Sequence, residues 1–225
     1  MAKASVGGVP VRGVLLDIDG TLLDSNDAHA RSWVEVFRRH GMHIPFERVR
    51  PLIGEGGDKL LPQLTGIDAE SAEGKALSEE RRELFLRDYL PALRPTRGAR
   101  TLVERLKAAG LRLVVATSSN GEELGALLRQ AGVAELIGRA TSSDDGASKP
   151  DPDIVRAALR EADLAPGDVV MVGDTPYDIV AAKRAGVKAI ALRCGGWWDD
   201  AALAGAAAIY DDPAALSEAG LIEAE

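Results

Sequence analysis

The chain has 225 residues, enough for one large or two modest domains, and 46% of them are hydrophobic, as in a globular protein. Its 27 lysines and arginines against 35 acids give a net charge of -8, which disfavours a protein that binds nucleic-acid phosphates. No apolar run approaches the roughly 20 residues of a membrane span, and residues 1–10 lack the apolar stretch of a secretory signal. With a single cysteine, Cys194, the composition predicts a cytoplasmic protein without nucleic-acid or membrane partners.

The first predicted strand, Val14 to Leu16, ends in two acids, Asp17 and Asp19, with Gly20 after them. Residues two apart on an extended chain point to the same side, so the two carboxylates are expected to share one site. They repel each other unless a cation lies between them, and a divalent metal ion is the simplest such cation. The alternative is that these residues form only a strand end and a turn.

From Ser25 to about Leu90 the spacing of apolar residues predicts helices and no strand. Ser25 or Asn26 is expected to cap a first helix that ends before Gly41. We predict an all-helical domain of residues 24–95, inserted into a core of residues 1–23 and 96–225. Its further expected parts are a short segment over 46–53, a glycine-bearing loop over 54–59, an apolar turn over 60–64 and a long charged helix over 72–90.

After Pro95 the pattern alternates between helix and strand with short loops, which predicts an α/β fold with a parallel sheet covered on both faces. The expected strands are 111–116, 139–141, 169–172 and 187–192. The expected helices are 99–106, 122–130, one that begins at Asp151 and Pro152 and ends near 162, and one from Thr175 and Pro176 to 186.

In such sheets, ligands bind at the carboxyl ends of the strands, and polar residues gather there in this sequence. The residues concerned are Asp17 and Asp19, the run from Thr117 to Asn120, Lys149, and the run from Gly173 to Asp178. We therefore expect a ligand site at one edge of the sheet.

These groups match the needs of phosphoryl transfer, which are a nucleophile, an acid for the leaving oxygen and charge stabilisation. Asp17 is the candidate nucleophile that forms an acyl phosphate. Asp19 is the candidate that protonates the leaving alkoxide and then deprotonates water.

The same pattern predicts a Mg²⁺ site, because magnesium prefers a few carboxylate and carbonyl oxygens together with water. The predicted ligands are the side chains of Asp17 and Asp174 and the backbone carbonyl of Asp19, with Asp178 holding metal-bound water. The Thr117 hydroxyl and the Ser118 amide are expected to hold phosphoryl oxygens, and Lys149 to supply a fixed positive charge.

Taken singly, each segment has a plainer interpretation: a helix cap at 117–120, a solvated loop lysine at 149, and a turn with an exposed helix acid at 173–178. Their common place at one sheet edge favours the functional interpretation. The three histidines, His29, His40 and His43, have no metal-ligand spacing, so we expect structural or surface roles for them.

The sequence resembles the haloacid dehalogenase superfamily in four motifs spread over residues 12–192. The first is Asp17-Ile-Asp-Gly-Thr-Leu, the second Thr117, the third Lys149-Pro150, and the fourth Gly173-Asp174 with Asp178. The resemblance implies a Rossmann-like core, an inserted helical cap, magnesium and an aspartyl-phosphate intermediate. The helical insert is similar to the caps of phosphoglycolate phosphatase and β-phosphoglucomutase relatives.

Within that superfamily, Asp19 and Asp174 argue against dehalogenases, which lack the second aspartate and the metal. The resemblance therefore favours a phosphatase that acts on a small phosphorylated metabolite. A sugar-phosphate mutase has the same core residues and stays open as the alternative, and a non-catalytic phosphate-binding protein is a third interpretation.

The glycine-bearing loop of the insert is the candidate for substrate selection. Glycines there allow close approach of the backbone to a ligand, and Lys59 offers a cation, although an ordinary surface loop fits equally well. The residues concerned are Gly54, Glu55, Gly56, Gly57 and Lys59. Trp197 and Trp198 are expected either in the cleft wall or at a domain or subunit contact, and the sequence allows a monomer or a homodimer.

Overall fold

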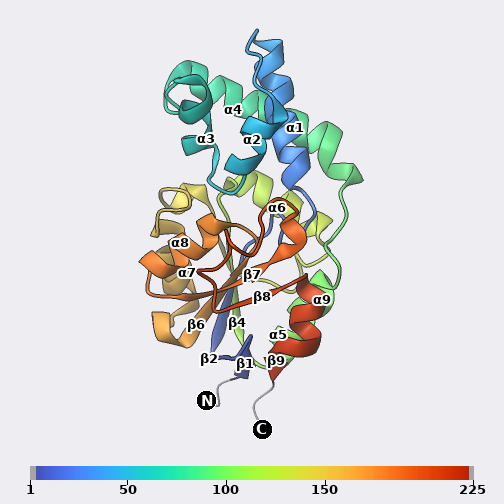
Figure 1. The fold of residues 1–225 in the computed structure, drawn as a ribbon, viewed down its shortest axis with the longest axis vertical. Coiled ribbons are helices and arrows are strands. Elements are labelled where there is room, and N and C mark those ends of the chain that lie inside the picture. The colour runs from blue at the N-terminus through green and yellow to red at the C-terminus, as the bar shows by residue number, and fades with distance from the viewer. Residues whose placement is uncertain (1–3, 223–225) are drawn as a thin grey trace.

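The computed structural model describes residues 4–222 and contains a six-stranded parallel sheet in the order β5-β4-β3-β6-β7-β8. The strands are β3 (Gly13–Leu16), β4 (Arg112–Ala116), β5 (Ala140–Thr141), β6 (Val169–Gly173), β7 (Lys188–Leu192) and β8 (Ala208–Tyr210). Helices cover both faces (Figure 1). The predicted α/β class is therefore confirmed.

The two faces of the sheet are packed by different helices, because successive side chains of a strand point to opposite sides. Val14 and Leu16 of β3 join one apolar cluster, whereas Leu15 joins the other. The first cluster includes buried residues of α5 (Ala99–Ala108) and α6 (Gly121–Gln130), and the second those of α7 (Asp153–Ala162) and α8 (Pro176–Arg184). All residues of β3 and β6 are buried, as expected for central strands of a covered parallel sheet.

Residues 26–92, here called the helical insert, lie between β3 and α5 and contain no named strand. They form α1 (Asn26–Arg39), α2 (Phe46–Val49), α3 (Gly57–Thr65) and α4 (Ala72–Leu84). The four helices lie together at one end of the molecule, away from the end that carries the two termini (Figure 1). Their own apolar cluster includes Trp33, Phe37, Leu61 and Leu77, so the insert has a core distinct from those of the sheet.

Two expected elements of the insert are wrong in detail. The apolar turn expected over 60–64 is part of α3, because Leu60 and Leu61 pack into the insert core and Gly66, with φ +77°, ends the helix. The long helix expected to reach Leu90 ends at Leu84 and continues as a π-helical turn, Phe85–Tyr89, followed by a 3₁₀ turn, Leu90–Ala92. Leu90, directly before Pro91, still has helical dihedrals, and the chain becomes extended only at Leu93.

Two expected helix caps are also wrong. The Ser25 hydroxyl does not cap α1 but donates to Asp19 Oδ1 at 2.5 Å. Helix α7 begins at Asp153, after Pro152, and no side chain caps it. By contrast, Thr175 caps α8 as expected, with a reciprocal bond from its own amide to the Asp178 carboxylate.

Several short elements were not predicted. A three-stranded antiparallel sheet pairs β1 (Ala4–Val6) with β2 (Val9–Val11) and β9 (Leu221–Ile222). Gly7 and Gly8, with φ of +57° and +77°, form the turn between β1 and β2. Strand β8 extends the large sheet, and a short helix, α9 (Pro213–Ala215), lies near the end of the described chain.

No helix among residues 4–222 is both long and apolar enough to cross a membrane. The proposed boundaries at residues 24 and 95 stay a prediction.

Candidate active site

Three strand ends lie side by side because β4, β3 and β6 are neighbours in parallel register. Leu16 pairs with Val115 on one side and Val172 on the other, so the residues that follow these strands meet at one edge. The Asp17 amide donates to the Val172 carbonyl at 2.9 Å and fixes the position of that aspartate. The polar residues expected at the carboxyl edge are therefore brought together by the sheet itself.

Lys149 binds two buried carboxylates at this edge. Its Nζ lies 2.5 Å from Asp17 Oδ1 and 2.7 Å from Asp178 Oδ1, and its side chain is only 1% exposed. Burial on its own lowers the pKa of Lys149, but Asp17 and Asp178 outweigh that effect and raise the pKa above its ordinary value. Lys149 is thus a permanent cation beside Asp17, and the solvated-loop interpretation is wrong.

Asp17 is held between like and unlike charges. Burial raises its pKa well above the ordinary range, Lys149 opposes that effect, and Asp178 and Asp174 reinforce it. This balance indicates a cluster with more negative charge than Lys149 alone neutralises.

A divalent cation fits the donor set of this cluster. Asp17, Asp174 and Asp178 are all buried, and one carboxylate oxygen of each lies within 4.8 Å of the others. Burial and Asp178 raise the pKa of Asp174 to about 7, although hydrogen bonds from Asn26 and Thr21 oppose the shift. Mg²⁺ prefers hard oxygen donors, and this cluster has three carboxylates beside a single cation, Lys149. These residues could therefore hold the ion.

Asp19 accepts three hydrogen bonds from side chains. Ser25 Oγ and His29 Nε2 lie 2.5 and 2.8 Å from Oδ1, and Ser119 Oγ lies 2.9 Å from Oδ2. Burial opposes ionisation of Asp19, but His29 and these hydroxyls prevail and lower its pKa below the ordinary range. The site therefore stabilises the carboxylate form of Asp19.

His29 belongs to the site, and the expectation of a merely structural or surface histidine is wrong for it. The residue is 4% exposed, stacks on Phe85 and contacts Asp19. Ser25 and His29 lie one helical turn apart just after Asp19, and this spacing in the sequence indicates that both can reach Asp19. His40 instead is half exposed and pairs with Glu80.

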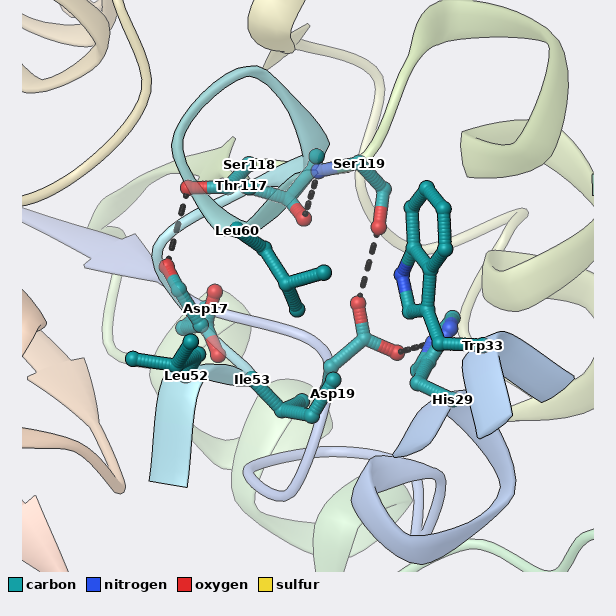
Figure 2. A pocket seen from close by; sticks show the side chains of 13 residues that line it. Asp17, Asp19, His29, Trp33, Leu52, Ile53, Leu60, Thr117, Ser118 and Ser119 are labelled. Carbon is teal, nitrogen blue, oxygen red and sulfur yellow. Dashed lines mark hydrogen bonds and ion pairs between the residues drawn. The ribbon is translucent and has the colours of Figure 1, made fainter. Parts of the chain in front are cut away.

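Thr117, Ser118 and Ser119 lie beside Asp17 and Asp19 in the cavity (Figure 2). Thr117 Oγ1 accepts from the Ser119 amide at 3.1 Å, and Ser118 Oγ accepts from the Lys149 amide at 3.3 Å. The loop is followed by α6, which is capped by Asn120 rather than by these residues. The Thr117 side chain and the backbone of this loop are thus placed at the sheet edge, whereas the hydroxyls of Ser118 and Ser119 are bound to Gly54 and Asp19.

Only some residues of the loop predicted to select the substrate line the cavity. Gly54, Gly56 and Gly57 line the cavity, whereas Glu55 and Lys59 do not. Glu55 accepts from Gln63 at 2.5 Å, and Lys59 Nζ donates to the Ser148 carbonyl and lies 2.8 Å from Asp151. Ser118 Oγ donates to the Gly54 carbonyl at 3.1 Å, so this loop contacts the sheet edge directly.

Arg50 and Trp197 form a second contact between the insert and the sheet edge. Arg50 is 2% exposed, donates to the Gly195 carbonyl, and lies over the Trp197 ring at 5.6 Å. Trp197 also meets Phe46 edge-on. The expected role of Trp197 at a domain contact agrees with this packing.

The complete cavity lies between the sheet edge and the insert (Figure 2). It is lined by Asp17, Asp19, His29, Trp33, Leu52, Ile53, Gly54, Gly56, Gly57, Leu60, Thr117, Ser118 and Ser119.

The site consists of a buried aspartate beside a lysine, at the carboxyl edge of a parallel sheet and under a helical insert. This is the arrangement expected of a haloacid dehalogenase-like hydrolase, and comparison with known proteins agrees. The family model of haloacid dehalogenase-like hydrolases matches residues 11–186, and the chain belongs to that family. It is 30% identical over 219 residues to a phosphoglycolate phosphatase of Rhodospirillum rubrum, covering 92% of this chain and 90% of that protein.

Solved structures are similar over most of the chain. A hydrolase from Pseudomonas syringae aligns with a TM-score of 0.83 at 26% identity, covering 91% of this chain and 95% of that one. A β-phosphoglucomutase from Clostridium difficile aligns with a TM-score of 0.78 at 17% identity, covering 90% and 92%. The second likeness shows a shared fold alone.

Proposed function

We propose that the protein is a magnesium-dependent phosphomonoesterase that hydrolyses a small phosphorylated metabolite through an aspartyl phosphate on Asp17. The observation that carries the proposal is the contact of Asp17 with Lys149 at 2.5 Å, at a strand end that opens into the cavity beside Asp19. The buried cation of Lys149 favours the ionised form of Asp17 against burial and the neighbouring acids, and it attracts the phosphate to the same place.

In the first step, an oxygen of the Asp17 carboxylate attacks phosphorus, and the bond from phosphorus to the ester oxygen breaks. In the complex with substrate Asp19 must carry a proton, against the hydrogen bonds that favour its ionised form, and it donates that proton to the departing alkoxide. Thr117 and Ser118 hold phosphoryl oxygens from one side while Lys149 stabilises their charge.

In the second step, water attacks phosphorus and the bond to Asp17 breaks, which releases inorganic phosphate and restores the aspartate. Asp19, ionised since the first step, accepts the proton of that water. The hydrogen bonds from Ser25, His29 and Ser119 favour the ionised form of Asp19, which is the form that acts as the base. The same residue thus acts as acid and then as base.

The residues that would hold Mg²⁺ are Asp17 and Asp174 through their side chains and Asp19 through its carbonyl, with Asp178 close enough to bind a ligand water. The ion would supply positive charge that offsets repulsion between these acids and the substrate phosphate. The named relative supports the choice of a phosphatase.

Phosphate release from a panel of phosphate monoesters, from ethyl phosphate to p-nitrophenyl phosphate, tests the proposal. Release that requires Mg²⁺, stops with EDTA and is absent from a folded Asp17→Asn variant is expected. Turnover that survives in Asp17→Asn would contradict the assignment of the nucleophile.

The mutase alternative rests on the shared fold with β-phosphoglucomutase. A mutase would isomerise a hexose 1-phosphate faster than it releases phosphate. Hexose 6-phosphate formation, measured beside phosphate release from the same hexose 1-phosphate, therefore separates the two activities. A protein that binds a phosphate analogue without turning over any ester would instead favour the non-catalytic interpretation.

A further inference from the structure

The wall of the cavity opposite the sheet edge is apolar. The helical insert contributes the large side chains Trp33, Leu52, Ile53 and Leu60 to it, together with three glycines. Trp33, Ile53 and Leu60 are at most 6% exposed and belong to the insert core. These side chains are fixed by packing, so the wall has a defined shape and chemistry.

The cations of the insert near the site are engaged elsewhere. Lys59 binds the Ser148 carbonyl and Asp151, Arg50 binds the Gly195 carbonyl and Asp27, and Arg81 binds Glu123. Among residues 4–222, neither lysine nor arginine lines this cavity. The one titratable side chain that the insert adds is His29, which already donates to Asp19.

The charge that remains in the cavity is negative. Asp17 and Asp19 both line it, and Lys149 is paired with Asp17 and Asp178. The N-terminus of α3 is the positive end of a helix dipole, but its first turn already carries Asp58. The Mg²⁺ proposed beside Asp17 would serve the transferring phosphate, so on the insert side a carboxylate or a second phosphate of the substrate would meet apolar carbon instead of a cationic partner.

The indole of Trp33 offers a neutral donor in the same place. Its nitrogen lies on the edge of the ring that faces the cavity (Figure 2). An N–H group can donate to a hydroxyl on the leaving group, and although it would also donate to a carboxylate, it carries no charge that replaces the missing cation.

The cavity is also small, with a volume of about 50 Å³. A single water needs roughly 10–15 Å³ of cavity volume counted in this way. The phosphoryl group occupies most of this space beside Asp17, and the leaving group can extend toward a second cavity of about 410 Å³ that shares Gly57 and Ser118 with the first.

We infer that the substrate is the phosphate ester of an uncharged alcohol, and that esters with a second anionic group are discriminated against. This inference rests on the proposed phosphatase activity and narrows its substrate class. It runs against a simple transfer of substrate from the phosphoglycolate phosphatase relative.

Pairs of esters matched in length test the inference. Steady-state kinetics with 2-hydroxyethyl phosphate against phosphoglycolate, and with glycerol 3-phosphate against 3-phosphoglycerate, isolate the effect of one carboxylate. For the uncharged member of each pair we expect kcat/KM at least about tenfold higher, since an anion without a partner is poorly tolerated in an apolar wall.

Three variants test whether the lack of a cation in the insert wall causes the preference for uncharged esters. Leu52→Arg places a cation on the half-exposed part of the wall and is expected to shift the preference toward phosphoglycolate by at least about tenfold, whereas Leu52→Gln, of similar length without charge, is not. Lys59→Gln is expected to leave the ratio within each pair unchanged, because Lys59 is turned away from the cavity.

The outcomes distinguish a failure of the proposed phosphatase activity from a failure of the inferred substrate preference. If no ester in the panel releases phosphate, the proposed function fails and the inference with it. If esters are hydrolysed but phosphoglycolate is preferred, and Lys59→Gln removes that preference, then the phosphatase stands and the inference is overturned.

Discussion

His29 Nε2 lies 2.8 Å from Asp19 Oδ1, and Arg81 Nη1 lies 3.2 Å from the other ring nitrogen of the same histidine. Arginine only donates, so His29 Nδ1 accepts and Nε2 carries the proton that is donated to Asp19. Arg81 is held in turn by Glu123 of α6 at 2.7 Å. A chain of contacts from α6 through the insert therefore fixes the tautomer that orients the proposed acid and base.

Removal of the imidazole tests this arrangement. In His29→Ala we expect kcat to fall about 10- to 100-fold with little change in KM, because Asp19 loses one of its orienting donors. His29 lowers the pKa of Asp19, so its loss raises that pKa and moves the acidic limb of the pH profile of kcat to higher pH. His40→Ala, at an exposed histidine, serves as the control. An unchanged pH profile in His29→Ala would show that His29 does not act through Asp19.

Because Arg81 pairs with a buried carboxylate, its loss is expected to lower the free energy of unfolding more than loss of the neighbouring Arg82. Glu123 is 1% exposed, so Arg81→Met leaves a buried carboxylate without its partner and is expected to lower the free energy of unfolding by about 3 kcal/mol. Arg82 pairs with the exposed Glu79 and Glu122, and Arg82→Met is expected to cost at most about 1 kcal/mol. Urea denaturation of both variants measures the difference, and equal losses would refute the distinction.

Lys149 is expected to control both the rate and the pH dependence of the reaction. In Lys149→Met, kcat should fall by roughly 10²- to 10³-fold, because a buried charge at the phosphoryl site is lost. Lys149 opposes the raised pKa of Asp17, so its removal raises that pKa further and moves the rising limb of the activity profile to higher pH. Lys188→Met, at the exposed start of β7, is the matched control. A pH profile that does not move would argue against direct coupling of Lys149 to Asp17.

Magnesium binding is expected to depend on pH through Asp174. Burial and Asp178 raise its pKa from 3.8 to about 7 in the metal-free protein, so the folded chain holds a proton that the unfolded chain releases between those values. The metal-free protein therefore loses stability as pH rises through that window.

Because Mg²⁺ must displace the same proton, its affinity should rise about tenfold per pH unit up to about pH 7 and then level off. Isothermal calorimetry at several pH values measures this, with Asp174→Asn as the control in which the dependence flattens. An affinity that is the same at pH 5 and pH 8 would be inconsistent with a metal site on Asp174.

The sequence predicts the large sheet well because its strands are continuous apolar runs that end in polar residues. Strand β6, Val169–Gly173, is nearly identical to its expected range, and Asp17, Thr117, Lys149 and Asp174 do gather at one edge. Parallel topology alone brings such residues together, so no knowledge of side-chain contacts is needed.

The missed elements depended on weaker signals or on tertiary contacts. The Gly7-Gly8 dipeptide between two short valine-containing segments is a hairpin signal that was overlooked, whereas β8 lies in an alanine-rich stretch with little strand propensity. The orientation of Lys59 depends on Ser148, which is 89 residues away, and local patterns do not reveal it. For His29 the spacing after Asp19 is a local signal, but the contact with Arg81 that fixes its ring is not.

The central claim is that Asp17 is phosphorylated during turnover. Rapid acid quench of the enzyme with a ³²P-labelled phosphate ester, followed by peptide mapping, measures this directly. We expect a hydroxylamine-sensitive label on the peptide that contains Asp17, absent from Asp17→Asn. Rapid release of phosphate by the wild-type enzyme without any label on that peptide would contradict it.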